Sequence, residues 1–306
     1  MNSLERVTAV VLCWNDAPRV VQLLEGLSRQ TARPDRVVVV DNGSRGGAPR
    51  FAPLAALNVD VLALPNNVGF AAAANHGIER AMQLGAGWVW LLNSDLQLPP
   101  HALASLRNAA RGTSRGGTDR GGTDRGGMDR CGMDRCGMVG AVLLESNGEL
   151  QAHGGGRVDL AKGLARHTTN PTEVPDYLSG ACLLLKVEML RDIGLFDEGY
   201  FFYWEDVDLG YRAAQGGWRL SVAHDCRVVH EEAASLGRWS AARWEHLFRG
   251  MVRFVRAHAP RPAVAVAARL VHHSAVMLWH GRLGPVRGAW RGAAREWLGV
   301  PVRSLW

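Results

Sequence analysis

Short apolar runs rich in β-branched residues alternate with helical segments over the N-terminal third of the chain. Each run is only four to six residues long and is bounded by polar residues, which is typical of a strand buried on both faces. The expected strands are Val7–Leu12, Val37–Val40, Val59–Leu64 and Trp88–Leu92, and the expected helices are Pro18–Gln30 and Asn75–Leu84. This alternation predicts an α/β fold, with a mostly parallel sheet covered by helices on both faces.

Polar residues cluster where three of these strands end. Trp14-Asn15-Asp16 follows the first strand, Asp41-Asn42-Gly43-Ser44 ends the second, and Asn93-Ser94-Asp95 ends the fourth. Ligands of parallel α/β sheets bind beyond the carboxyl ends of the strands. The sequence therefore predicts a binding site at this edge of the sheet.

The second half of the chain continues with strands and ends in helices. A small-residue turn leads into a buried strand within Tyr177–Leu185, and the other expected elements are strands at Val139–Leu144, Trp218–Ala223 and Arg227–His230 and helices at Lys186–Ile193 and Val207–Gln215. Beyond Trp239 the pattern is helical, with breaks at Pro260, Pro262, Gly281, Gly284 and Pro285.

A five-residue repeat, GGTDR-GGTDR-GGMDR-CGMDR-CGM, occupies residues 116–138. Each full unit carries one aspartate and one arginine and is rich in glycine, so the segment has little apolar surface to bury. We predict a flexible surface loop here. Cys131 and Cys136 belong to the repeat, and we expect no metal site at them.

The composition suits one large domain, or one domain with an appendage. The chain has 306 residues, 47% of them hydrophobic, and its five cysteines show no CxxC spacing, which argues against a disulfide framework. The N-terminus lacks a basic region before a long apolar stretch, and no run of about 18 apolar residues occurs. We therefore expect neither a signal peptide nor a transmembrane helix, and a reducing cytoplasm fits best.

Positive charge is concentrated at the C-terminus. The net charge is +6, yet residues 238–306 alone contain 12 arginines and two glutamates, with six of the 11 tryptophans. Arginine and tryptophan together suit an anionic membrane surface, where arginine meets headgroups and tryptophan sits at the interface. The alternative is an ordinary helical tail with a solvated basic face. We expect no nucleic acid partner, because no nucleic-acid-binding module is recognisable.

An acidic cluster follows an aromatic run in the second half of the chain. Phe201-Phe202-Tyr203-Trp204 precedes Glu205, Asp206 and Asp208. Carboxylates among aromatic rings are costly to desolvate and raise one another's pKa, which is how a general base is commonly built. The alternative is a helix N-terminus, where acids stabilise the dipole and cap free amides. We expect Asp208 to cap the helix that follows.

Four other features have both a binding and a structural interpretation. Asp41 could accept hydrogen bonds from a ribose or form an Asx-turn, and residues 66–77 (NNVGFAAAANHG) could approach a phosphate or form a plain capped loop. Asp95 could bind a divalent ion that bridges phosphates, or cap a helix. A lone histidine such as His230 is more often structural than a ligand.

Together these segments resemble the family 2 inverting glycosyltransferases of the GT-A fold, and among them the bacterial rhamnosyltransferase-like group that builds surface polysaccharides. The resemblance covers about Val7 to His230. It rests on VVLCWND, VVVVDNGS, NNVGFAAAANHGI, WLLNSD, YLSGACLLLK and GLFDEGYFFYWEDVDLGYRAAQGGW followed by VVH, in that order. It implies a Rossmann-like mixed, mostly parallel sheet in residues 1–237, followed by a helical C-terminal region at 238–306.

The resemblance also implies which residues bind the nucleotide sugar. Asn15 and Asp41 would hold the pyrimidine and the ribose, and Asn67, Gly69 and Asn75 would line the sugar-nucleotide pocket.

Further residues match the family's metal and catalytic motifs. Asp95 matches the last acid of the metal-binding motif, whereas Asn93 stands where many relatives have the first acid, which implies weaker metal affinity. Asp206 matches the catalytic base, with Glu205 beside it in the motif. His230 matches a histidine that completes the metal site in some members.

The implied reaction transfers a sugar from a dTDP- or UDP-activated donor to a hydroxyl of a glycan or lipid-linked acceptor, with Mg²⁺ or Mn²⁺ as cofactor. Rhamnose is the sugar that the resemblance suggests, and the basic tail implies an enzyme at the inner face of the cytoplasmic membrane. A sugar nucleotidyltransferase is an alternative, but it usually needs a glycine-rich basic loop after the first strand, which CWNDAP is not. A non-catalytic carbohydrate-binding protein is a further alternative, and the presence of Asp95 and Asp206 argues against it.

Overall fold

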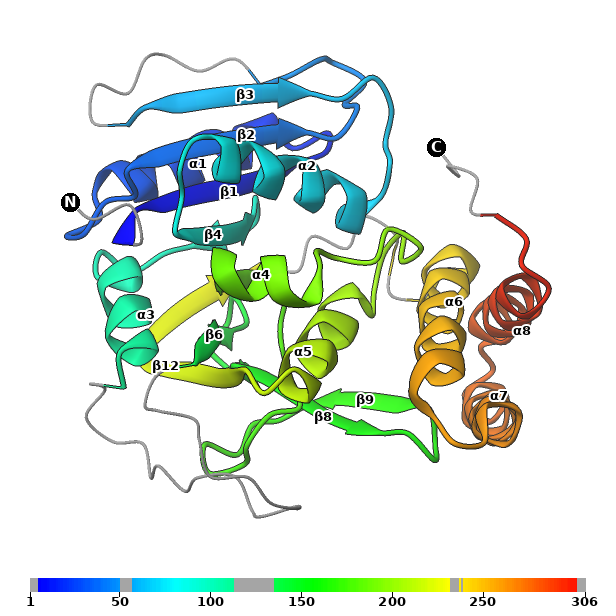
Figure 1. Ribbon diagram of the computed structural model, residues 1–306. Coiled ribbons are helices and arrows are strands. Elements are labelled where there is room, and N and C mark those ends of the chain that lie inside the picture. The colour runs from blue at the N-terminus through cyan, green and yellow to red at the C-terminus, as the bar shows by residue number, and fades with distance from the viewer. Residues whose placement is uncertain (1–4, 50–56, 113–134, 232–236, 238, 302–306) are drawn as a thin grey trace.

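The computed structural model describes residues 5–49, 57–112, 135–231, 237 and 239–301 (Figure 1). Its central sheet contains β1 (Val7–Cys13), β2 (Arg36–Asp41), β3 (Val59–Ala63), β4 (Trp88–Asn93), β5 (Leu96–Gln97), β6 (Cys136–Leu144), β7 (Leu150–His153), β11 (Cys182–Lys186) and β12 (Arg219–His230). A smaller sheet contains β8 (Gly155–Asp159), β9 (Leu164–His167) and β10 (Tyr177–Leu178).

The central sheet has the strand order β3-β2-β1-β4-β11-β6-β12-β5, with β7 paired to β6. Strands β3, β2, β1 and β4 are parallel, whereas β11 runs antiparallel to both β4 and β6. The parallel strands are buried along almost their whole length, except β3 at the sheet edge, as their uninterrupted apolar sequences predict. The predicted mixed, mostly parallel sheet is therefore confirmed.

Helices cover both faces of this sheet. One face packs against α1 (Ala17–Ser28) and α3 (Ala102–Ala110), and the other against α2 (Phe70–Gln83), α4 (Val187–Ile193) and α5 (Glu205–Gln215). Each helix contributes a stripe of fully buried side chains, such as Leu23 and Leu27 from α1 and Ile78 from α2. The two resulting apolar cores hold the carboxyl ends of β1, β2 and β4 in a fixed arrangement.

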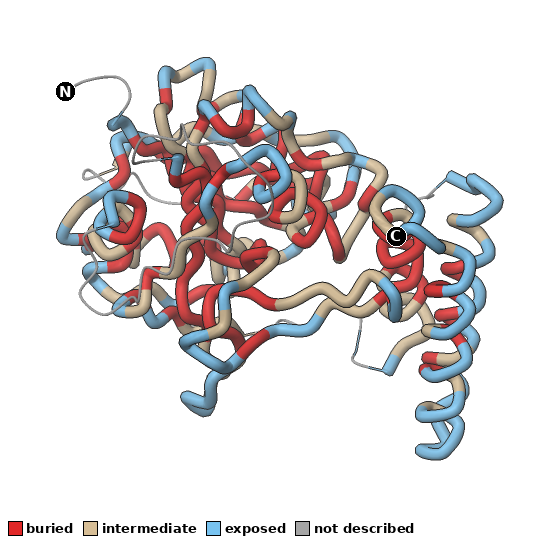
Figure 2. Tube along the Cα trace, turned by 60° about the horizontal axis from the view of Figure 1, so that its bottom comes forward, coloured by how far each residue is buried: buried red, intermediate tan, exposed pale blue. Residues whose placement is uncertain are grey.

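Three helices form a separate layer beside the sheet: α6 (Ala241–His258), α7 (Pro262–Trp279) and α8 (Leu283–Trp297) (Figures 1 and 2). They enclose a third core, in which Phe254 and Leu270 pack with Tyr200 and Trp204 from the segment before α5. The division drawn from the sequence at residue 237 therefore crosses a shared core. No helix in the described part of the chain is long and apolar enough to cross a bilayer.

The second half of the chain differs from the sequence expectations in three places. Strands β7, β8 and β9 are not apparent in the sequence pattern, since they are short and only partly buried. The two expected strands after Trp218 form one strand, β12, with an irregularity between Ala223 and Arg227. Helix α5 begins at Glu205 and so includes the acidic cluster.

The end of the repeat is also folded differently from the expectation of a surface loop. Cys136 and Met138 lie in β6 and are buried, and Cys136 pairs with Arg219 of β12. Gly137 between them leaves room for Met189, whose sulfur would lie 2.6 Å from an added Cβ. The apolar residues of the last repeat unit thus complete a strand, and residues 116–134 lie outside the described residues.

Candidate active site

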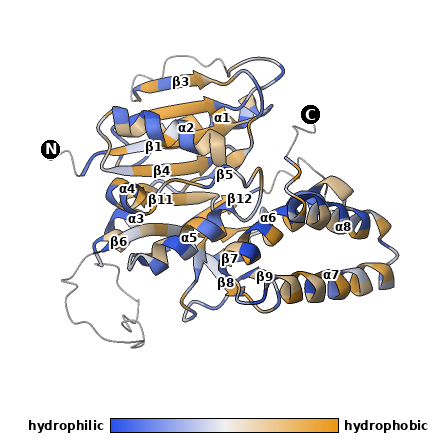
Figure 3. Ribbon diagram, turned by 45° about the vertical axis from the view of Figure 1, so that its right-hand side comes forward, coloured by the Kyte–Doolittle hydropathy of each residue, from blue (hydrophilic) through white to orange (hydrophobic). Residues whose placement is uncertain are grey.

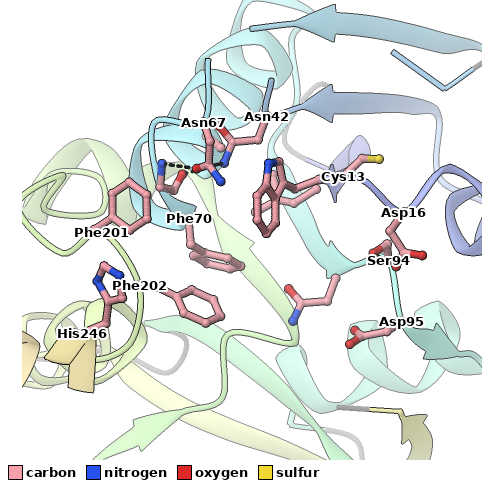
Figure 4. A pocket seen from close by; sticks show the side chains of 15 residues that line it. Cys13, Asp16, Asn42, Asn67, Phe70, Ser94, Asp95, Phe201, Phe202 and His246 are labelled. Carbon is pink, nitrogen blue, oxygen red and sulfur yellow. Dashed lines mark hydrogen bonds between the residues drawn. The ribbon is translucent and has the colours of Figure 1, made fainter. Parts of the chain in front are cut away.

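A pocket opens at the carboxyl edge of the sheet, where β1, β2 and β4 end (Figure 4). The strand register places Leu12 level with both Val40 and Asn93, so the polar loops that follow these strands meet. The pocket is lined by Leu12, Cys13, Trp14, Asp16, Asn42, Asn67, Gly69, Phe70, Ala73, Asn93, Ser94, Asp95, Phe201, Phe202 and His246. It lies at the edge where the sequence predicts a binding site.

One wall is a network of amides that joins the β2 loop to the start of α2. The amide of Asn42 donates to Asn67 Oδ1 and to the carbonyl of Gly69, both at 3.1 Å, and its oxygen accepts from the Val68 N–H at 2.9 Å. Asn67 Oδ1 also accepts from the Gly69 N–H. Sequence reasoning named Asn67 and Gly69 and missed Asn42, although Asn42 lies within a cluster that it identified.

Gly69 allows this wall to touch the aromatic run before α5. Its φ of 91° lies in the left-handed region, and an added Cβ would come within 2.6 Å of the carbonyl oxygen of Phe201. The same carbonyl accepts a hydrogen bond from the N–H of Phe70 at 2.7 Å. Phe201 and Phe202, which form part of the opposite wall, are thereby held against the start of α2.

Asp41 and Asn15 are placed beside the pocket and not among its lining residues. Asp41 is buried at the end of β2, and its Oδ1 has no hydrogen-bond partner in the described part of the chain. Asn15 has a positive φ of 54°, and its side-chain oxygen accepts from the N–H of Arg45 at 2.9 Å. Asn15 thus ties the β1 loop to the β2 loop, while its neighbours Trp14 and Asp16 face the pocket.

Asn75 does not join the other predicted binding residues. It is buried in the middle of α2, where its amide donates to the Phe196 carbonyl and to Glu198. Its oxygen accepts from the N–H of Phe196 at 3.0 Å. Both ends of the amide are therefore used to anchor the segment that leads to the aromatic run, which is a structural role.

Asp95 and His230 come together across the strand pair β12–β5. His230 is level with Leu96 in that pair, which brings its Nε2 to 3.5 Å from Oδ1 of Asp95. Asn93 and Asp95 line the pocket, whereas His230 does not, and Oδ1 of Asn93 is buried without a hydrogen-bond partner among the described residues. The 134 residues between Asp95 and His230 conceal this proximity in the sequence.

The hydrogen bonds of His230 fit a metal ligand. Its Nδ1 lies 2.9 Å from Oε1 of Gln151, an acceptor, so Nδ1 carries the proton of the neutral ring. The Nε2 lone pair then faces the Asp95 carboxylate, and two such acceptors 3.5 Å apart favour a cation between them. Within the described ranges no cluster of three or more His, Cys, Asp or Glu side chains could hold a metal.

Asp206 and Glu205 lie in the first turn of α5. Asp206 Oδ2 accepts from the Gly180 N–H at 2.8 Å, and Oδ1 from the Val207 N–H at 2.8 Å. Glu205 is 6% exposed, and its Oε2 has no hydrogen-bond partner among the described residues. The cluster therefore combines the two alternatives drawn from the sequence: it is a helix N-terminus, and it holds a carboxyl pair in which Glu205 is buried and Asp206 is half-buried. Neither carboxyl group lines the pocket, although the Phe201–Phe202 wall leads directly into them.

The surroundings of the two carboxyl groups separate their protonation. Burial raises the pKa of Glu205 well above its ordinary value, and the charge of Asp206 raises it further. Burial also raises the pKa of Asp206, but the N–H groups of Gly180 and Val207 oppose this effect. The pKa values of both groups are raised, and the two opposing hydrogen bonds favour the negative charge on Asp206 over Glu205.

Asp208 does not cap α5, contrary to expectation. The residue at the N-cap position is Trp204, which makes no side-chain capping bond. Asp208 lies inside the helix, where Oδ2 pairs with Arg212 at 2.7 Å and Oδ1 with His258 Nε2 at 3.1 Å. Its position four residues before an arginine on a helix explains the first pair, and only the tertiary structure brings His258 to it.

Helix α6 contributes to the site from the C-terminal region. His246 lines the pocket, stacks on Phe201 with 5.2 Å between ring centres, and is 2% exposed. Gly250 lies against Tyr203 and Trp204, two residues with positive φ of 72° and 74°. Sequence reasoning missed this role, because nothing in the local pattern of α6 distinguishes a pocket wall from an exposed helix face.

Known proteins share sequence with this chain. A model of glycosyl transferase family 2 matches residues 8–124. An N-acetylglucosaminyl-diphospho-decaprenol L-rhamnosyltransferase of Mycobacterium tuberculosis is 30% identical over 256 residues, which cover 75% of this chain and 77% of that protein. The chain belongs to glycosyltransferase family 2.

Solved structures share the fold of this family 2 glycosyltransferase. GalNAc-T7 with UDP, GalNAc and Mn²⁺ covers 96% of this chain with a TM-score of 0.62 and 14% identity, over 58% of its own length. Mannosyltransferase PcManGT from Pyrobaculum calidifontis, in complex with GDP-Man and Mn²⁺, covers 96% with a TM-score of 0.54 and 19% identity, over 88% of its own length. The predicted GT-A fold is confirmed.

Proposed function

We propose that this glycosyltransferase transfers a sugar from a nucleotide diphosphate sugar to a hydroxyl of a lipid-linked acceptor, with inversion at the anomeric carbon, in cell-surface polysaccharide synthesis. The observation that carries the proposal is the geometry of one pocket. Asp95 lines one side of it with His230 Nε2 3.5 Å from its Oδ1, and the aromatic wall of Phe201 and Phe202 leads along the chain into Glu205 and Asp206. Direct displacement requires two groups: side chains that hold a phosphate-binding metal ion, and a carboxylate base.

Asp206 is the proposed general base. Its carboxylate stays ionised beside protonated Glu205 and removes the proton from the attacking hydroxyl. The hydrogen bonds from Gly180 and Val207 hold the carboxylate in one orientation, and the N-terminal end of α5 favours its charge. A single displacement inverts the anomeric centre and needs no protein nucleophile.

A divalent ion, Mg²⁺ or Mn²⁺, would be held by Asp95 Oδ1 and His230 Nε2. When bound, it would stabilise the negative charge that develops on the leaving diphosphate. Gln151 keeps the His230 lone pair directed at this position. Asn42 holds the Asn67–Gly69 wall in the shape that the nucleotide meets, while Asp41 and Asn93 offer buried oxygens without partners in the described chain for hydroxyl groups of the donor.

The donor and acceptor are proposed from the relative. The Mycobacterium tuberculosis protein is an L-rhamnosyltransferase that acts on N-acetylglucosaminyl-diphospho-decaprenol, as its name states. By analogy we propose dTDP-rhamnose as the donor, with a UDP-sugar as the alternative, and a polyprenyl-linked sugar as the acceptor. An acceptor of this kind resides in a bilayer, so the protein would work at the inner face of the cytoplasmic membrane.

Calorimetry with a panel of nucleotide sugars tests the proposal. The panel contains dTDP-rhamnose, UDP-N-acetylglucosamine and GDP-mannose, each with Mn²⁺, with Mg²⁺ and with a chelator. We expect one pyrimidine nucleotide sugar to bind, with an affinity that falls in the chelator and that loses most of its metal dependence in His230→Gln. Absence of binding by every donor would refute the proposed reaction, and binding that is indifferent to the chelator would refute the metal site.

A further inference from the structure

Helix α7 exposes an apolar face along its whole length. Its inner face packs into the third core through Val266 and Leu270. Its outer face carries large exposed side chains, with exposed fractions of 62% at Val264, 65% at Val271, 37% at Val276, 53% at Leu278 and 88% at Trp279. Figure 3 shows the hydrophobic colour along this helix.

The remaining residues of this outer face are almost all alanine. The other exposed positions of α7 are Ala263, Ala267, Ala268, Ala275 and His272, so His272 is its single exposed polar side chain. A soluble helix normally presents charged residues to water, and a continuous exposed apolar stripe marks an interaction surface. Large apolar side chains are also exposed on α8, at Leu283, Trp290 and Trp297, but there exposed Arg287 and Arg291 lie among them, whereas the exposed face of α7 carries no charged residue.

The charges around α7 indicate what this surface contacts. The C-terminal region has only two acidic residues, and both face inward. Glu245 pairs with Arg291 and Arg295, and the carboxylate of Glu296 pairs with Arg249 and Arg253. Exposed charge in the described part of this region is therefore positive, and exposed Arg261 and Arg282 stand at the two ends of α7. Such a surface complements negatively charged headgroups.

The packing of α7 also determines its orientation. One face is held by the third core, so only the opposite face is free to enter an apolar medium. A helix in that position lies parallel to a bilayer surface, with its apolar side chains below the headgroups and its flanking arginines among them.

We propose that the outer face of α7 docks on the surface of an anionic lipid bilayer. This inference rests on the proposed function and specifies the membrane-contacting element. The surface places the enzyme where a polyprenyl-linked acceptor resides, and it leaves α6 free to form the wall of the pocket.

Vesicle flotation of the full-length protein tests the proposal. The test variant carries Val271→Gln, Leu278→Gln and Trp279→Gln, and the matched control is Val174→Gln, since Val174 is 66% exposed and belongs to a loop before β10. We expect the wild type and the control to float with phosphatidylglycerol vesicles, and the triple variant to bind at least about tenfold more weakly, because burial of these side chains is lost. A variant with Arg261→Gln and Arg282→Gln should lose the preference for phosphatidylglycerol over phosphatidylcholine.

Two other measurements separate the alternatives. If a second copy of the chain covers α7, the wild type sediments as a dimer, the triple variant sediments as a monomer, and both float equally, which would overturn the proposal. Calorimetry with the nucleotide sugar panel should give the same donor affinity for the wild type and the triple variant. Loss of flotation with retained donor binding therefore supports the docking surface, whereas failure of donor binding in the wild type concerns only the proposed reaction.

Discussion

At the scale of single residues, the acidic pair at the start of α5 is the proposed catalytic centre. Asp206 accepts two backbone hydrogen bonds, and Glu205 has an oxygen with no partner in the described chain, so one carboxyl group is prepared to hold charge and the other to hold a proton. Position in the helix alone does not distinguish them. The distinction comes from Gly180, in the loop between β10 and β11, whose N–H donates to Asp206. The two residues are in close contact, since a Cβ added at Gly180 would lie 3.3 Å from the Cβ of Asp206.

Asp206→Asn should reduce sugar transfer by about 10²–10⁴-fold, because an amide cannot accept the proton of the attacking hydroxyl. The amide is almost the same size as the carboxylate, so donor affinity should stay within about twofold. Transfer is measured with dTDP-rhamnose and a short-chain polyprenyl-linked N-acetylglucosamine, and affinity by calorimetry. An unchanged turnover in this variant would remove Asp206 from the mechanism.

Glu205→Gln should make stability less dependent on pH. The pKa of Glu205 is raised above its ordinary value of 4.5, so the unfolded chain releases this proton at a lower pH than the native protein. The stability of the wild type therefore falls as the pH rises from 4.5 through the raised value, and glutamine removes that loss. Thermal unfolding between pH 5 and pH 8 should show a shallower decline for the variant. If the melting temperatures of the wild type and the variant change in parallel with pH, the pKa of Glu205 is not raised.

At the scale of elements, α6 supports the segment that carries the acidic pair. Arg253 forms two hydrogen bonds with Asp197, at 2.7 and 2.9 Å, and His258 reaches Asp208. Gly250 allows the helix backbone to approach Tyr203 and Trp204, which hold uncommon positive φ values just before Glu205. The conformation of this catalytic segment thus depends on a helix from the C-terminal region.

Gly250→Ala should disturb this support. The added methyl group would lie 2.6 Å from the Tyr203 carbonyl oxygen and 2.9 Å from Trp204 Cδ1, so the two segments must separate. We expect a loss of about 1–3 kcal/mol in unfolding free energy and a clear loss of transfer.

The matched control for this variant is Gly26→Ala in α1. No atom lies within 4 Å of the Cβ that it would add, so stability should hold or rise by about 0.4–1 kcal/mol. Thermal unfolding and the transfer assay give both readouts. Equal behaviour of the two variants would contradict the role assigned to α6.

At the scale of the whole molecule, the C-terminal region shares a core with the proposed catalytic segment and also carries the proposed contact with the membrane. The third core combines Tyr200, Trp204 and Val207 from the catalytic segment with side chains of α6, α7 and α8. A chain that ends at residue 237 would expose this apolar surface. The two proposed functions lie on different helices of the region, because His246 of α6 lines the pocket whereas the outer face of α7 is exposed. Figure 1 shows α6 nearer to the sheet than α7, and Figure 2 shows the exposed face of the helical layer.

Truncation after residue 237 should therefore abolish donor binding, as well as membrane binding. We expect the shortened protein to unfold at a lower temperature or to aggregate, whereas the triple variant of α7 keeps the wild-type melting temperature, since its substitutions are on the surface. Calorimetry and light scattering provide the measurements. A truncated protein that binds the donor normally would restore residues 1–237 as an independent domain.

Much of the first half of the fold could be predicted from the sequence. Apolar runs that alternate with helices form strands buried on both faces, and a parallel sheet between two layers of helices buries them in this way. The polar strand ends marked the edge at which the pocket opens, and the ordered motifs indicated the family. The second half was harder, because β7, β8 and β9 are short and their residues are half buried, so they have no clear period. The start of β6 was also missed, because its first residues belong to the glycine-rich repeat.

What the sequence determined by itself was local: the strands that end in polar clusters, the acidic pair, and the positive charge of the last 69 residues. What only the tertiary structure decided was which distant residues meet. Pairing of β12 with β5 brings His230 to Asp95, burial raises the pKa of Glu205, and packing in the third core turns one face of α7 outward. Protonation and metal binding depend on desolvation and on neighbours a few ångströms away, and chain folding, not sequence order, sets both.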